Sequence, residues 1–128
     1  MKQILKNTKW TTFICCLFIS IAMYAQTPGD KICGEWVNEQ MDKKITFDKV
    51  GDGSYTAKLS WKKTSDGPVV GTTIVKKLIF KDGKYSGGQL FTPKSGWING
   101  KALVNDKGEL ELTGSKSFFS KTQIWTRP

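Results

Sequence analysis

Apolar and polar positions alternate along most of this chain, and the alternation is clearest between residues 55 and 61. Odd-numbered positions in that segment are apolar or aromatic, and even-numbered positions are polar. A period of two predicts a β-strand with one buried face. The residues expected on the buried face are Tyr55, Ala57, Leu59 and Trp61.

Turn-forming residues interrupt this pattern at short intervals. Asp82-Gly83, between Phe80 and Tyr85, is typical of a two-residue hairpin turn, because both residues tolerate a positive φ. No helical periodicity appears after residue 26. The runs between turns predict eight short strands, at 33–38, 43–50, 54–62, 71–80, 84–92, 97–104, 108–113 and 119–127.

Eight antiparallel strands favour a sheet that closes into a barrel, whose interior is filled by side chains or holds one small ligand. The two ends of the strand region support closure. Gly34 and Trp36 begin it, and Trp125 and Arg127 end it. In a closed barrel these ends are neighbours, and a guanidinium can stack on an indole. We therefore predict an all-β fold in which Gly34, Trp36, Trp125 and Arg127 close the barrel.

The N-terminal 25 residues have a different character. Three lysines precede an apolar run over 13–23, which ends near the small residue Ala25. This pattern predicts a signal peptide at 1–25, removed before Gln26. The alternative is a retained membrane anchor, but the run is shorter than the roughly 20 residues of a spanning helix. We expect an exported protein, periplasmic or extracellular, without a stable membrane anchor. Residues 26–32 would be a short polar lead-in, and 33–128 a single barrel domain.

Export changes the charge and cysteine counts. The full chain carries +9, and loss of three N-terminal lysines leaves 17 basic against 11 acidic residues, a charge of +6. The remaining lysines are spread in pairs along the chain, which favours a solvated exterior over a nucleic-acid surface. Cys33 would be the only cysteine left, so no internal disulfide is expected. It is interpreted as a small half-buried residue, with a reactive thiol as the alternative.

Catalytic residue patterns are sparse. The sequence contains no histidine, which excludes imidazole-based acid–base catalysis and imidazole metal ligands. We expect no metal, no cofactor and no enzymatic activity. A carboxylate-dependent hydrolase is a distant alternative, because Glu109 and Glu111 alternate with leucines and would face solvent.

Candidate ligand contacts fall into two groups. One group would face the barrel interior, where its members either fill the core or line an apolar pocket. The other lies beside strand glycines, which mark bulges, bends or the close approach of a ligand. The interior candidates are Tyr55, Leu59, Trp61, Tyr85 and Phe91, and the candidates for a site at the rim are Gln89, Trp97 and Lys101.

Five short motifs in order resemble a family of small secreted bacterial proteins of unknown function with a lipocalin-like barrel. Ala57 replaces a glycine of the family pattern, and Thr92 stands where the family has aspartate. The resemblance implies a lipocalin-like (calycin-like) barrel and an exported location, but no activity. The matching residues are Gly34 and Trp36; Gly53, Tyr55, Lys58 and Leu59; Pro68, Gly71 and Ile74; Gly87, Gly88, Pro93 and Gly96; and Thr122, Gln123, Trp125, Thr126 and Arg127.

Two functions remain open from the sequence. The first is binding of one small apolar or amphipathic ligand inside the barrel. The second is an envelope protein-interaction module with a filled core and a basic exterior. A closed pocket with one or two polar groups would favour the first.

Overall fold

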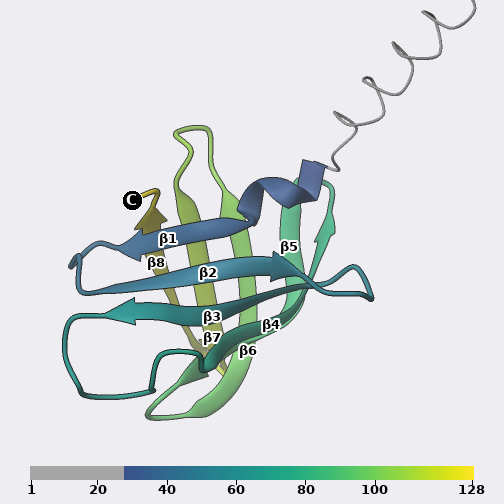
Figure 1. Cartoon of the computed structure of the whole chain (residues 1–128). Helices are drawn as coiled ribbons and strands as arrows, with labels where there is room; N and C mark the ends of the chain where they lie inside the picture. The colour runs from purple at the N-terminus through teal and green to yellow at the C-terminus, as the bar shows by residue number, and fades with distance from the viewer. Residues whose placement is uncertain (1–27) are drawn as a thin grey trace, which may run out of the picture.

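Eight antiparallel strands form a closed barrel in the computed structural model, which describes residues 28–128 (Figure 1). Each strand pairs with the next along the chain, and the last pairs with the first. The predicted fold class is confirmed; the predicted signal peptide lies outside the described residues. The strands are β1 (Gly34–Asn38), β2 (Lys43–Lys49), β3 (Tyr55–Lys62), β4 (Thr73–Lys81), β5 (Lys84–Thr92), β6 (Gly96–Val104), β7 (Leu110–Lys116) and β8 (Phe119–Thr126).

Within the predicted lead-in, Pro28–Ile32 forms a short 3-10 helix, η1. Ile32 is fully buried, and η1 lies across one end of the barrel (Figure 1). A Cβ on Gly29 would lie 2.7 Å from the Tyr55 hydroxyl and 2.9 Å from the Phe80 ring, so a glycine lets η1 pack this closely. A single helical turn has no periodicity that a sequence can reveal. No helix between residues 28 and 128 is long and apolar enough to span a membrane.

The barrel closes where the sequence predicts. β1 and β8 pair through Val37 with Thr126 and Asn38 with Trp125. The Arg127 guanidinium lies 3.8 Å from the centre of the buried Trp36 ring. Its nitrogens also donate to the carbonyl oxygens of Lys31, Cys33 and Glu35 at 2.8–3.0 Å.

Gly34 makes room for this arginine. Its φ is +103°, and a Cβ there would lie 3.0 Å from Nη1 of Arg127. A side chain at position 34 would therefore meet both backbone strain and the guanidinium. Gly34, Trp36 and Arg127 therefore lie together beside the seam between β1 and β8.

A β-bulge in β3 overturns one interior prediction. Lys44 faces Trp61 across the β2–β3 ladder, but the next residue, Ile45, faces Leu59, so Ser60 is an extra residue. A bulge changes the side of the sheet on which the following residue lies. Trp61 is consequently 40% exposed on the barrel exterior, with the Lys44 ammonium 5.6 Å from its ring centre. The prediction that Trp61 faces the interior is wrong.

A second bulge lies at the strand glycines. The β5–β6 register shifts between Tyr85 and Gly88, and Gly87 has a φ of +71°. A Cβ on Gly88 would lie 2.7 Å from the Leu78 side chain, so the wall is tight at this point. These glycines therefore mark a bulge and the close approach of a neighbouring side chain, and not the approach of a ligand.

Candidate functional site

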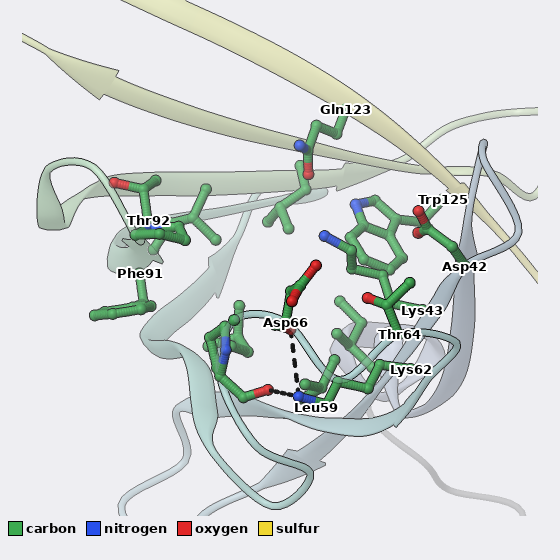
Figure 2. Close-up of a pocket in the computed structure, with 17 residues that line it drawn as sticks. Asp42, Lys43, Leu59, Lys62, Thr64, Asp66, Phe91, Thr92, Gln123 and Trp125 are labelled. Atoms are coloured by element: carbon green, nitrogen blue, oxygen red, sulfur yellow. Dashed lines mark hydrogen bonds between the residues drawn. The ribbon is translucent and has the colours of Figure 1, made fainter.

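A cavity of about 370 Å³ opens at the end of the barrel opposite η1 (Figure 2). Its mouth lies between the start of β2, the loop that joins β3 to β4, and the end of β5. Inward-facing side chains of several strands form its deeper wall. The apolar residues of this wall are Ile45, Leu59, Ile74, Leu90, Leu112 and Trp125.

Polar side chains surround the mouth, and some are held by the protein itself. Lys62 donates to the carbonyl oxygens of Ser65, Asp66 and Pro68 at 2.9–3.3 Å, which ties the β3–β4 loop to its strand. Asp42 accepts a hydrogen bond from the Asn38 amide. Hydrogen bonds within the protein therefore hold part of the polar rim in place around an apolar interior. Its polar residues are Asp42, Lys43, Lys62, Thr64, Asp66, Thr92 and Gln123.

Trp125 lines this cavity, and its indole N–H is buried without a hydrogen-bond partner among the described residues. Trp125 is 4% exposed, and among residues 28–128 its Nε1 is the buried side-chain nitrogen or oxygen without a hydrogen-bond partner. The indole of Trp36, at the closed end, instead donates to the Ile32 carbonyl at 2.8 Å. Buried donors are almost always satisfied, and Trp125 is a residue of the cavity wall, so a ligand in the cavity is a candidate source of the missing acceptor.

Lys43 and Gln123 line the same cavity as Trp125. Figure 2 shows the Lys43 side chain extending towards the Trp125 ring, with the Gln123 amide on the same side of the cavity. Gln123 faces Leu112 across the β7–β8 ladder, so it belongs to the inward-facing set with Trp125. Within the described chain the Lys43 ammonium forms no ion pair.

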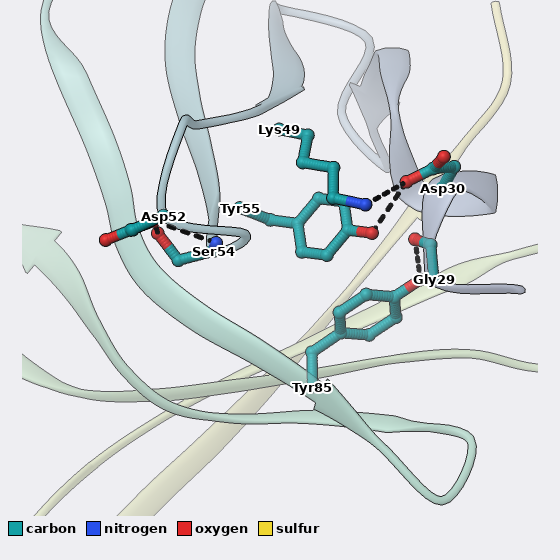
Figure 3. Close-up of polar contacts among 7 residues, drawn as sticks. All are labelled: Gly29, Asp30, Lys49, Asp52, Ser54, Tyr55 and Tyr85. Carbon is teal, nitrogen blue, oxygen red and sulfur yellow. Dashed lines mark hydrogen bonds and ion pairs between the residues drawn. The ribbon is translucent and has the colours of Figure 1, made fainter. Parts of the chain in front are cut away.

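The opposite end of the barrel is packed (Figure 3). Tyr55 and Tyr85 are buried edge to face with ring centres 5.5 Å apart. Tyr55 donates to Asp30 at 2.7 Å, and Tyr85 donates to the Gly29 carbonyl. Burial, together with the neighbouring Tyr55, raises the pKa of Tyr85 well above its ordinary range. These tyrosines fix η1 to the barrel floor.

The predicted interior residues separate into three groups. Leu59 lines the cavity wall. Tyr55 and Tyr85 are interior as predicted, but they belong to the packed end and do not line the cavity. Phe91 lies at the cavity edge, and its ring points outward onto Trp97, with ring centres 5.5 Å apart (Figure 2).

The predicted rim residues do not form one site at the mouth. Trp97 is 37% exposed on the outside of the barrel, where the Lys76 ammonium lies 4.1 Å from its ring centre. Gln89 and Lys101 line a shallow exterior depression over Gly88 and Gly100, and Trp97 does not line it. The bulge at Gly87 accounts for the outward position of Gln89, because it changes which β5 residues face outward.

Sequence reasoning missed most of the cavity. Trp125 was expected only to close the barrel; it pairs with β1 and also lines the cavity. Lys43 and Gln123 had no apparent role. One signal was present, since the alternation from Trp125 places Gln123 on the inward face, where a polar side chain is unusual.

The closed eight-stranded barrel, with a packed end and a cavity at the other end, has a lipocalin-like fold. The chain belongs to a bacterial family described as "Uncharacterized protein conserved in bacteria (DUF2147)", whose model matches residues 19–127. A comparison with curated proteins finds no match.

A solved structure of similar architecture is protein HP1028 from Helicobacter pylori, described as belonging to the lipocalin family. The TM-score is 0.62 at 19% sequence identity, and the match covers 76% of this chain and 82% of HP1028. At this identity the likeness shows a shared fold.

Proposed function

We propose that this protein is an exported, non-enzymatic carrier that binds one small amphipathic ligand in the mouth of its barrel. The observation that supports the proposal is the cavity of about 370 Å³, with its apolar wall and a few polar groups at the opening. Ligand sites usually combine these properties in volumes of about 300–1,000 Å³. The signal-like pattern of residues 1–25 supports the exported location.

The cavity also favours a carrier over an interaction module with a filled core. The Tyr55 and Tyr85 hydroxyls bind η1 at one end of the barrel, whereas the opposite end contains the cavity. Apolar cavities of this size bind apolar guests, because the guest leaves water and contacts the wall. The Leu59, Leu90 and Leu112 side chains would contact the apolar part of the ligand.

Binding of N-phenyl-1-naphthylamine, a neutral dye that fluoresces in apolar sites, tests this proposal. We expect saturable 1:1 binding with a Kd on the order of micromolar, which corresponds to about −8 kcal/mol. Leu59→Trp fills the wall of the cavity and should weaken binding at least about tenfold, since one guest and a larger side chain compete for the same space.

Trp61→Leu is the matched control for this variant. It lies two residues further along β3, but its side chain is on the barrel exterior, so dye affinity should be unchanged. Thermal unfolding of both variants verifies that the fold survives. Absence of saturable dye binding by the wild-type protein would contradict the carrier function.

A further inference from the structure

The polar groups of the cavity differ in whether the protein already engages them. Lys62 is engaged by three loop carbonyl oxygens, and Asp42 by the Asn38 amide. Trp125 Nε1 has no acceptor within residues 28–128, and the Lys43 ammonium has no acidic partner there. Two groups of the cavity that have no partner among residues 28–128, the Trp125 N–H and the Lys43 ammonium, are hydrogen-bond donors. The Gln123 amide and the Asp66 carboxylate also line the cavity.

A donor pair of this kind constrains the polar end of a ligand. An indole N–H can only donate, and a lysine ammonium can only donate and is positively charged. The complementary group is an acceptor with negative charge, and a carboxylate has two oxygens that can accept from both donors. The Gln123 amide, on the same side, can supply a further donor.

We infer that the ligand is a fatty-acid-like carboxylate, whose carboxylate accepts hydrogen bonds from Trp125 Nε1 and Lys43. This inference rests on the proposed carrier function and specifies its ligand class. The alkyl chain lies against Ile45, Leu59 and Leu112, deeper in the barrel. The carboxylate stays at the mouth, where solvent reduces the cost of burying its charge.

Asp66 is the group that could support a different ligand. Its carboxylate also lines the mouth (Figure 2), so a cationic amphiphile would have one acidic neighbour. A cation, however, would leave the Trp125 N–H without an acceptor and would face Lys43. Asp66 and Lys43 are both exposed, so solvent and salt screen both charges, and the buried Trp125 N–H is the group that distinguishes an anion from a cation. The buried donor therefore favours the carboxylate.

Isothermal titration calorimetry with decanoate, decanol and decylamine at pH 7.5 tests the inference. The three compounds share a ten-carbon chain and differ at the polar end. A purely apolar cavity would prefer decanol, because the charged end groups lose more hydration. We expect instead that decanoate binds more tightly than decanol, by about tenfold, and that decylamine binds most weakly.

Substitutions at Trp125 and Lys43 test whether these two donors cause the preference for decanoate. Trp125→Phe keeps an aromatic wall and removes the N–H, and it should weaken decanoate about tenfold. Lys43→Gln should weaken decanoate several-fold and leave decanol nearly unchanged. Asp66→Asn should strengthen decanoate slightly. The matched controls Lys63→Gln and Trp61→Phe alter side chains that do not line the cavity and should change neither affinity.

The outcomes separate this inference from the carrier function. If the neutral dye and decanol bind at least as well as decanoate, the carrier function stands and the carboxylate preference is wrong. Tightest binding by decylamine, with loss on Asp66→Asn, would assign a cationic ligand instead. Unchanged decanoate affinity in both Trp125→Phe and Lys43→Gln would also overturn the inference. If none of the compounds binds, both proposals fail.

Discussion

Trp36 and Trp125 show how the same side chain takes two roles in one barrel. Both are buried, but Trp36 donates to a backbone carbonyl of η1, whereas Trp125 donates to no acceptor in the described chain. The first indole completes a packed end, and the second lines a cavity. Sequence alone could not separate them, because the difference depends on which carbonyl oxygens lie within reach of each ring.

Tyr85 predicts how the stability of the folded protein depends on pH. Burial raises the pKa of its hydroxyl in the folded state, so the stability it contributes is present below the ordinary tyrosine pKa of about 10 and is lost as pH rises above that value. Tyr85→Phe should destabilise the protein by about 1 kcal/mol at pH 7.5, through loss of the bond to Gly29. This difference should shrink towards pH 11.

Urea unfolding at several pH values measures this trend. Burial, with the neighbouring Asp30, also raises the pKa of the Cys33 thiol, so the comparison is made in a Cys33→Ser background. A stability difference that stays constant from pH 7.5 to pH 11 would contradict the assignment of the alkaline loss to Tyr85.

At the scale of elements, turn residues and alternation were sufficient to predict the eight strands. Local chemistry decides hairpins, and Asp82-Gly83 forms the predicted β4–β5 turn with both residues at positive φ. The predictions that were wrong or missing concern features that depend on contacts between residues distant in the sequence. The extra residue Ser60 moves Trp61 to the exterior, and η1 is held by contacts with Tyr55 and Phe80, distant in sequence.

Pairing between β1 and β8 gives the prediction at this scale. β1 and β8 pair over only a short segment, so the contact between Trp36 and Arg127 should contribute much of the free energy that holds the two strands together. Trp36→Ala should lower the free energy of unfolding by about 3–5 kcal/mol, as for other large buried aromatic residues. Arg127→Ala should lower it by about 0.5–2 kcal/mol, since the arginine is more exposed. Urea denaturation measures both, and a negligible change for Trp36→Ala would contradict this account of closure.

The whole molecule divides into a solid end and a hollow end. The sequence predicted a closed barrel, and it left open whether the interior is filled. That question depends on small shifts of register: the bulges at Ser60 and Gly87 move Trp61, Gln89 and Phe91 away from the interior. Loss of the Trp61 side chain from the interior leaves Leu59 on the wall of a cavity.

The four indole N–H groups of the barrel provide the most direct test of this division. In a ¹H–¹⁵N spectrum of ¹⁵N-tryptophan-labelled protein, resonances are assigned by Trp→Phe substitution and followed during titration with N-phenyl-1-naphthylamine. We expect the Trp125 signal to shift with saturation, while Trp36 at the packed end and Trp61 and Trp97 on the exterior stay in place. Saturable shifts of Trp61 or Trp97 with no change at Trp125 would contradict ligand binding in the mouth of the barrel.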